Sequence, residues 1–464
     1  MDHGKVDMLK PAACASRLLP LATAMAAILG TVPTETASAA TLLVTDCSDD
    51  AGSGSSGTLR NTIAVAPDAS TIQIPVACST ITLTQGAIVI SGSITDMTIV
   101  GQGPAATTID AGGRGSPAHY NRAFESHNLG ELSFEHLTIA HAKYTGTALP
   151  YGGCVYAANN IQLLDAVVTD CKVAPLTGSH TSLGGGIFSG GYVHLISSVV
   201  SHSLAANAPT GTSSAGGIFA KTGLNATYST IADNGATSHY LDSSGGGIYS
   251  VSGNVTLVRS TVSGNRADFY SAMEVAGSET DYLNVNSSTI SGNTANRQNT
   301  VGAFMKVSIY DSTVAFNHVY SSSTSLPAGL FSDHEIKAYN SIFANNDSQM
   351  GPANDVFSNA VPVPLFGANL LITATSNPAP GGTLSDCPRL GRLSDNGGAT
   401  LTIPLLSGSP AIDAGPPSQV LSTDQRGTGF PRKVGSATDI GAFERQAGTI
   451  DDIVFFSGFE TRCN

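Results

Sequence analysis

The chain has 464 residues, and only 12% of them are charged, about half the share found in a typical soluble domain. Its 51 glycines, its lack of tryptophan and its many Ser, Thr, Val and Ile residues favour strands and tight turns over helices. The net charge of -13 comes without any basic run, which argues against nucleic acid as a partner because phosphates would be repelled. We therefore expect an all-β protein.

The N-terminus, residues 1–39, has the three parts of a secretory signal peptide. Basic residues precede an apolar run at about 18–32, and Ala37-Ser38-Ala39 provides a cleavage site. The run is shorter than the ~20 residues that a membrane span needs, and no later stretch is long and apolar enough. We expect export, cleavage after Ala39 and no transmembrane segment.

Six cysteines remain after that cleavage, an even number in an exported chain. Such cysteines are expected to form disulfides, although six of them allow 15 pairings. We favour bonds between near neighbours, because each bond then stays within one structural segment. The expected pairs are Cys47 with Cys78, Cys154 with Cys171, and Cys387 with Cys463.

Between residues 129 and 375, the phrase S-T-V-x-x-N returns with a spacing of roughly thirty residues. Clear copies end at Asn234, Asn265, Asn293, Asn317 and Asn346, and weaker ones end at Ala142, Cys171 and Ser203. A glycine phrase and an alternating stretch such as NVTLV precede the copies, so that one repeat holds three short strands. Such strands leave no room for crossover helices. The pattern predicts a right-handed parallel β-helix with three sheets.

In a β-helix each residue lies over its counterpart one rung away, at about 4.8 Å. An apolar column three positions before the asparagine is expected in the core: Ile139, Val168, Val200, Ile231, Val262, Ile290, Val314 and Phe343. We expect a second one five residues upstream, interrupted by Ala226 and Ala338: Phe134, Leu163, Leu195, Leu257, Val285 and Ile309. A third column, Gly153, Gly186, Gly217, Gly247 and Gly329, would need a positive φ or a close backbone approach. The asparagines should hydrogen-bond from rung to rung.

The segments on either side of the repeats, 40–128 and 376–446, carry the most specific phrases. Thr58-Leu59-Arg60 and Ile63 resemble the opening of secreted bacterial β-helix proteins, and TIDAGG and NRAF are similar to their early rungs. LSDNGGATLTIPLLSGSPAIDAG, TDQRG and DIGAFE resemble the choice-of-anchor Q domain, and the central repeats resemble those of polymorphic outer membrane proteins. The tail at 447–464 is similar to one found on exported proteobacterial proteins.

This resemblance implies a location and an architecture. It implies a bacterial protein that is secreted or associated with the outer-membrane surface, built as a β-helix with an N-terminal cap, first rungs at 40–128 and a β-rich anchor-type module at 376–446. It supplies no catalytic residue.

The polar columns are where chemistry is expected, since the chain has no P-loop, zincin or C-x-x-C motif. One position before the asparagine the residues are His141, Asp170, His202 and Asp233. Six positions before it they are His136, Asp165, Ser197, Tyr228 and Arg259. Nine positions before it, His194 lies between Gln162 and Asn225. We find no tight carboxylate cluster for calcium and expect no cofactor and no metal.

Two interpretations of these columns remain open. In the first, carboxylates orient the histidines as acid and base groups that cut a polysaccharide. Tyr228 and Arg259 would suit β-elimination on a uronic acid, and Asp170 and Asp233, two rungs apart, fit the carboxyl separation of a glycosidase. In the second, the alternation of His with Asp merely avoids stacking like charges.

The sequence as a whole favours binding over turnover. We expect a monomeric cell-surface or secreted protein that binds or structures extracellular polysaccharide, or mediates adhesion to a host or cell-surface ligand. The alternative is a polysaccharide lyase, or less readily a glycoside hydrolase, acting on an extended acidic polysaccharide laid across the rungs.

Overall fold

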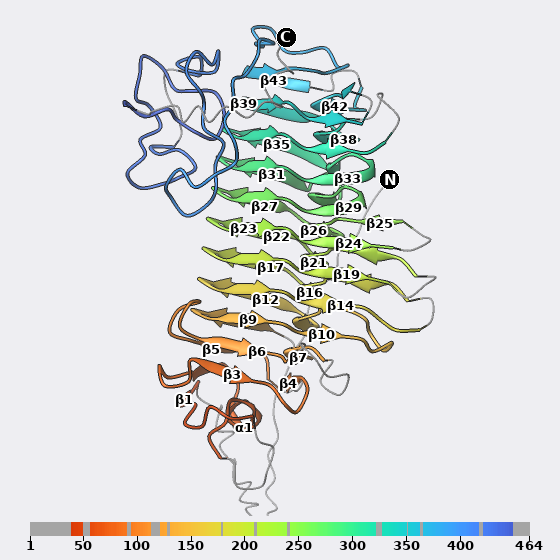
Figure 1. Cartoon of the computed structure of the whole chain (residues 1–464), viewed down its shortest axis with the longest axis vertical. Helices are drawn as coiled ribbons and strands as arrows, with labels where there is room; N and C mark the ends of the chain where they lie inside the picture. Colours follow the sequence, from red (N-terminus) through yellow and green to blue (C-terminus); the bar gives the residue numbers. More distant parts are fainter. Residues whose placement is uncertain are drawn as a thin grey trace, which may run out of the picture. The chain divides into compact units, whose positions relative to one another are not determined.

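The chain coils into a parallel β-helix of about ten turns (Figure 1). The computed structural model describes residues 39–448 except 50–55, 91–93, 113–120, 128–129, 178–179, 208–210, 239–241, 322–326, 350, 362–364 and 417–420. Residues 1–38 of the expected signal peptide and 449–464 of the expected tail lie outside this range. The described part of the chain contains one helix, α1 (Leu59–Val65), whose buried side packs near β2 and β4.

Sheet 1 has 21 strands, arranged as two ladders that follow one another in each turn of the coil. Ladder 1 consists of β1 (Thr41–Leu43), β2 (Ser70–Gln73), β5 (Met97–Val100), β8 (Glu131–Glu135), β12 (Asn160–Leu164), β17 (Val193–Ile196), β22 (Leu224–Thr227), β27 (Val255–Val258), β31 (Tyr282–Asn286), β35 (Lys306–Tyr310), β39 (Ile336–Ala344) and β43 (Leu365–Ile372). Ladder 2 consists of β3 (Thr80–Thr82), β6 (Thr108–Asp110), β9 (Thr138–Ala140), β13 (Val167–Thr169), β18 (Val199–Ser201), β23 (Thr230–Ala232), β28 (Thr261–Ser263), β32 (Thr289–Ser291), β36 (Thr313–Ala315) and the second halves of β39 and β43.

Sheets 2 and 3 complete each turn. Sheet 2 contains β10 (Lys143–Tyr144), β14 (Lys172–Val173), β15 (Ser182–Leu183), β19 (Leu204–Ala206), β20 (Ser213–Ser214), β24 (Gly235–Thr237), β25 (Ser243–Ser244), β29 (Arg266–Phe269), β33 (Thr294–Gln298), β37 (His318–Val319), β40 (Asp347–Ser348) and β41 (Gly351–Pro352). Sheet 3 contains β4 (Ile88–Ile90), β7 (Phe124–Ser126), β11 (Val155–Ala157), β16 (Ile187–Ser189), β21 (Ile218–Ala220), β26 (Ile248–Ser250), β30 (Met273–Ala276), β34 (Val301–Phe304), β38 (Leu330–Ser332) and β42 (Val356–Ser358).

The predicted all-β, three-sheet parallel architecture is confirmed, and the strand pairs between rungs are parallel. The expected strand content of a repeat is wrong, because a bend divides the sheet 1 segment of each central turn into two strands. The hand of the coil stays a prediction.

Both expected apolar columns lie in the core. Residues of the first column, on ladder 2, and of the second, on ladder 1, are 0–1% exposed. They belong to one continuous cluster that runs through the coil. Burial of this apolar column in every rung, at about 25 cal/mol per Å² of apolar surface, is the main source of stability for such a coil.

The expected glycine column needs a correction. Val155 pairs with Ile187, so Cys154, and not Gly153, is the counterpart of Gly186. None of the five glycines has a positive φ; the close approach is what matters. A Cβ on Gly217 would lie 3.0 Å from the side chain of Asn234.

The asparagine column forms the predicted ladder of side-chain hydrogen bonds. The Nδ2 atom of Asn265 donates to Asn293 Oδ1 at 3.0 Å and to the carbonyl of Ile231 at 3.0 Å. The same pattern links Asn234 to Asn265, Asn293 to Asn317, and Asn317 to Asn346. The ladder ends on the buried carboxylate of Asp355, which Asn346 contacts at 2.9 Å. Burial raises the pKa of Asp355 to about 6.

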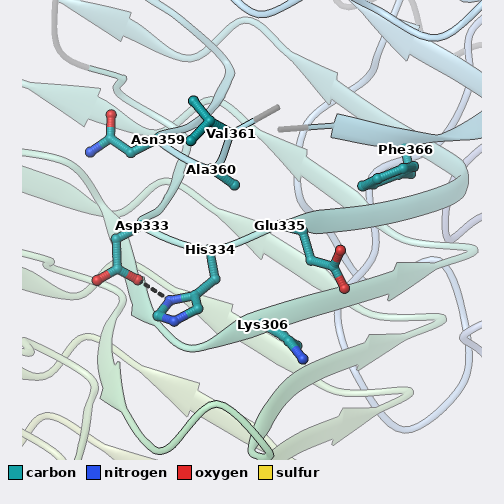
Figure 2. A pocket seen from close by; sticks show the side chains of 8 residues that line it. All are labelled: Lys306, Asp333, His334, Glu335, Asn359, Ala360, Val361 and Phe366. Carbon is teal, nitrogen blue, oxygen red and sulfur yellow. Dashed lines mark hydrogen bonds and ion pairs between the residues drawn. The ribbon is translucent and has the colours of Figure 1, made fainter. Parts of the chain in front are cut away.

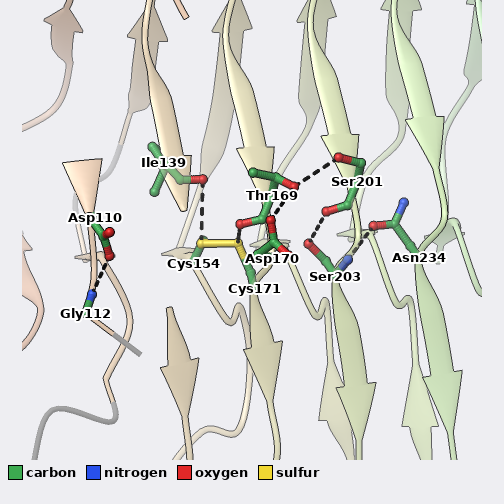
Figure 3. The surroundings of a disulfide bond; sticks show 10 residues. All are labelled: Asp110, Gly112, Ile139, Cys154, Thr169, Asp170, Cys171, Ser201, Ser203 and Asn234. Carbon is green, nitrogen blue, oxygen red and sulfur yellow. Dashed lines mark hydrogen bonds between the residues drawn. A yellow bond between two sulfur atoms is a disulfide. The ribbon is translucent and has the colours of Figure 1, made fainter. Parts of the chain in front are cut away.

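Two of the three expected disulfides, Cys47–Cys78 and Cys154–Cys171, are present. Cys463, the expected partner of Cys387, lies outside the described residues. Figure 3 shows that Ser203 and Asn234 follow Cys171 in the next two rungs. The second disulfide therefore occupies the position where later rungs have a glycine above an asparagine.

Candidate functional site

Eight of the nine predicted site residues lie at two corners of the coil, where the backbone φ is positive. The corner between the two ladders holds His136 (53°), Asp165 (45°), Tyr228 (50°) and Arg259 (48°). The corner between ladder 2 and sheet 2 holds His141 (61°), Asp170 (55°), His202 (51°) and Asp233 (56°). His194, the ninth residue, lies within β17 between Gln162 and Asn225, as predicted.

The backbone conformation gives a physical reason for these residue types. A left-handed conformation costs an ordinary residue about 1 kcal/mol or more, and Asp, Asn and His tolerate it better than others. The choice of His and Asp at these corners therefore has a conformational cause that is independent of catalysis. The same corners direct the side chains outward, so that the side chains of His202 and Asp233 are 59% and 57% exposed.

The histidines do pair with carboxylates of neighbouring rungs. His136 Nδ1 lies 2.9 Å from Asp165 Oδ2, and His202 Nε2 lies 3.9 Å from Asp233 Oδ2. His141 contacts Asp110 of the preceding rung at 3.0 Å. Asp170 instead accepts a hydrogen bond from the hydroxyl of Thr169 at 3.2 Å. The columns thus form separate solvent-facing pairs.

Tyr228 and Arg259 have different surroundings, because they contact the C-terminal segment. The Nη2 atom of Arg259 donates to Thr423 Oγ1 at 2.8 Å, and its Nε donates to the carbonyl of Asp424 at 3.3 Å. A Cβ on Gly427 would lie 3.1 Å from the ring of Tyr228. The guanidinium of Arg259 lies 5.4 Å from that ring. Both bulky residues hold a strained corner conformation where the C-terminal segment packs against them.

The C-terminal segment, by which we mean the described residues of 390–446, packs on the outward side of ladder 2 from β28 onward. Figure 1 shows it in blue beside the later rungs. Thr261, Thr289 and Thr313, on successive rungs, are at most 2% exposed. Gln425 is the centre of the contact. Its side chain accepts from Thr289 Oγ1 at 2.6 Å and donates to Thr261 Oγ1 at 2.9 Å.

The earlier rungs of sheet 1 are not covered in this way. The column of the buried threonines continues here as Thr138, Val167, Val199 and Thr230, all half-buried. The hydroxyl of Thr138 donates to the carbonyl of Pro104 at 2.7 Å. We name the outward side of β8 and β9, β12 and β13, β17 and β18, and β22 and β23 the open face. All predicted site residues except Arg259 lie on it or at its corners, and Tyr228 lies where the C-terminal segment begins to cover it.

Glu274 on sheet 3 is a functional candidate that the sequence did not reveal. It is the register partner of Tyr249 and Gly302, and the ring of Tyr270 lies across Gly302, 2.2 Å from where a Cβ would be. Burial raises the pKa of Glu274 to about 7, and the side chain of Tyr249 acts in the opposite direction. This carboxyl could have been found by aligning Tyr249 with its counterparts in the neighbouring rungs. The glycine phrase that marks this strand in other rungs is absent from the rung of Glu274.

An open cavity of about 450 Å³ lies between sheet 3 and ladder 1 in the later rungs (Figure 2). Asp333 and His334 form a pair on one side of it, with Nδ1 and Oδ1 2.5 Å apart, and Lys306 and Glu335 lie on the other. Its remaining lining residues are Asn359, Ala360, Val361 and Phe366. None of the predicted site residues lines this cavity.

Nowhere in the described part of the chain do three or more His, Cys, Asp or Glu side chains gather closely enough to hold a metal ion. Among the described residues, no helix is long and apolar enough to cross a membrane. No family model, curated protein or solved structure matches this chain.

Proposed function

We propose that this protein is exported and binds an extended extracellular glycan along the open face. A parallel β-helix offers such a ligand a regular surface, because equivalent side chains recur at the strand spacing of about 4.8 Å. The two disulfides are compatible with an oxidising extracellular location. Attachment to a host or cell surface would follow from binding of a surface glycan.

The observation that carries the proposal is the division of ladder 2 into a covered and an uncovered part. From Thr261 onward the C-terminal segment satisfies the outward threonines. Before that rung, Val167, Val199 and Thr230 keep part of their surface in solvent. A surface of aliphatic side chains bordered by imidazole, carboxylate and hydroxyl groups, which ends at a packed segment, suits a polymer that offers both C–H faces and hydroxyls.

The exposed His–Asp pairs support binding more directly than catalysis. His136 with Asp165 and His202 with Asp233 lie on opposite edges of the open face, and each pair is about half exposed. His136 and His141, at the two corners of one turn, are five positions apart along the chain, so the corners are about 16 Å apart across the face. That separation suits contacts to both edges of a polymer.

The proposal is tested by binding of residues 40–464 to a panel of immobilised neutral and acidic polysaccharides. We expect the double variant His136→Ala/His202→Ala to bind its glycan several-fold more weakly. His318→Ala is the matched control, because His318 forms a similar pair with Asp347, at 2.7 Å, on sheet 2. Retention of no glycan by the wild type would refute the proposal. Release of unsaturated uronates or of new reducing ends would instead favour the lyase or hydrolase alternative.

A further inference from the structure

Tyr192 lies on the open face with its ring across a glycine of the next rung. It precedes β17 and points outward, because Val193 after it is fully buried. A Cβ on Gly223 would lie 3.0 Å from Cε2 of Tyr192 and 2.5 Å from the carbonyl oxygen of Asn254. Gly223 also has a φ of +116°, which L residues rarely adopt. Because Gly223 has no side chain, the ring of Tyr192 can lie directly over its backbone.

This arrangement holds the ring against the sheet. The backbone N–H of Tyr192 donates to Asn160 Oδ1 at 2.9 Å, which fixes the entry to the strand. Tyr192 is half-buried, so part of its surface still faces solvent, and burial raises the pKa of its hydroxyl. Because the ring is already positioned, a ligand that packs on it orders few additional torsions.

Polar side chains lie beside the ring. His194 and Asn225 follow Tyr192 and Gly223 by two positions, on the same side of the sheet, and are register partners. Gln162 occupies the equivalent position one rung earlier. Imidazole and amide groups both donate and accept hydrogen bonds. The result is an aromatic platform with hydrogen-bonding groups along one edge.

The charge around this platform selects an uncharged ligand. The outward residues of the four surrounding rungs of ladder 1 contain neither lysine nor arginine: Asn160, Gln162, Leu164, Tyr192, His194, Ile196, Gly223, Asn225, Thr227, Asn254, Thr256 and Val258. Glu131, on the same ladder, interacts electrostatically with His194. The chain carries a net charge of -13. Lys221 is exposed in the turn before Gly223, but an acidic sugar lying on the strands would meet no basic side chain there and would be repelled by Glu131, whereas a neutral pyranose can pack its C–H face on the ring.

We propose that Tyr192, with His194 and Asn225 beside it, is a stacking subsite for one neutral pyranose of the bound glycan. The inference rests on the proposed function and narrows its ligand from glycans in general to uncharged ones. The ring supplies apolar contact area with few torsions to order, and the imidazole and amide bond the sugar hydroxyls.

The test compares binding of β-glucan, mannan and galactan with binding of polygalacturonate and alginate, using residues 40–464. We expect a neutral polysaccharide to bind and Tyr192→Ala to weaken that binding about tenfold, while Tyr192→Phe, which keeps the ring, stays close to the wild type. Tyr282→Ala is the matched control. Tyr282 occupies the same position three rungs later, where its ring faces Lys306 at 5.9 Å.

Thermal unfolding of each variant verifies that it is folded. If Tyr192→Ala does not fold, the double variant His194→Ala/Asn225→Ala keeps the ring and should still weaken binding several-fold. Binding to a neutral glycan that neither variant weakens would overturn the subsite and leave the proposed function standing. Binding to acidic polysaccharides alone would also overturn it. Failure of the wild type to bind any glycan would refute the proposed function itself.

Discussion

At the corners of the coil, the positive φ restricts which residues are tolerated, so the type of residue found there reflects the backbone as well as any function. His136, Asp170 and Asp233 tolerate a positive φ, so their identity alone is weak evidence for catalysis. Tyr228 and Arg259 tolerate it poorly, and both contact the C-terminal segment. Residues that are unfavourable at a positive φ, such as Tyr228 and Arg259, are therefore better evidence for a specific role than the His and Asp residues are.

Glu274 gives a residue-scale prediction for the pH dependence of stability. Burial raises its pKa from 4.5 to about 7, so between these values the folded chain holds a proton that the unfolded chain has lost. The contribution of this group therefore favours folding most below pH 4.5 and is lost as the pH rises to about 7. Relative to Glu274→Gln, the wild type should lose stability across that window in urea unfolding.

The exposed Glu279, which follows the same strand, provides the control for that experiment. Glu279→Gln should leave the pH profile of the wild type unchanged. Parallel profiles for the wild type and Glu274→Gln would show that the protonation of Glu274 is not coupled to folding.

At the scale of the rung, the same two positions are occupied either by a glycine and an asparagine that pack together or by two cysteines that form a disulfide. Cys154 and Cys171 take the places that Gly217 and Asn234 take two rungs later. An asparagine at position 171 could donate to the carbonyl of Ile139, as Asn234 donates to Val200. The exchange is therefore compatible with the ladder.

We predict that Cys154→Gly/Cys171→Asn is more stable than Cys154→Ser/Cys171→Ser by about 1 to 2 kcal/mol. An asparagine at position 171 can reach the carbonyl of Ile139 in the preceding rung, whereas a serine there would bond within its own rung, as Ser203 does. Urea unfolding with and without a reductant measures this difference. The Gly/Asn variant should also lose less stability on reduction than the wild type, whose disulfide contributes about 2 to 4 kcal/mol. Equal stability of the two double variants would contradict this account of the rung.

The rungs were predictable from the sequence because every turn of a solenoid packs in the same way. Core residues and asparagines therefore recur at a regular spacing along the chain. The second strand in sheet 1 was not predictable in this way. The bend that creates it lies at His136 and its counterparts, whose side chains differ from rung to rung while their backbone conformation is the same. Glu274 was missed because Ala272 and Thr300 replace the glycine on which the alignment depended.

At the scale of the molecule, the C-terminal segment determines which part of sheet 1 is free. The resemblance of its phrases TDQRG and DIGAFE stays a prediction, and their contact with a threonine column 129 to 164 residues away in the chain could not be predicted from the sequence. Arg426 lies between the rings of Phe430 and Phe443, at 4.0 and 3.8 Å, and pairs with Asp424. These residues fold the segment, while Gln425 joins it to the coil.

We predict that Gln425→Ala loosens this contact, because it leaves the buried hydroxyl of Thr289 without its acceptor, at a cost of about 1 to 3 kcal/mol. Limited proteolysis should then cut within residues 390–446 faster than in the wild type, while the β-helix stays intact. Gln446→Ala, at the surface of the same segment, is the control. Unchanged cleavage in the Gln425 variant would mean that other contacts suffice to hold the segment.

The most direct test of the central claim compares two variants, one with a new charge on the open face and one with a new charge on the neighbouring sheet 2. Val199 and Leu204 belong to the same rung, and both are half-buried aliphatic residues that point outward, from ladder 2 and sheet 2 respectively. Equilibrium binding of a soluble neutral polysaccharide should be weakened at least about tenfold by Val199→Glu and left unchanged by Leu204→Glu. Equal binding by the two variants, or a loss only in Leu204→Glu, would contradict a glycan site on the open face.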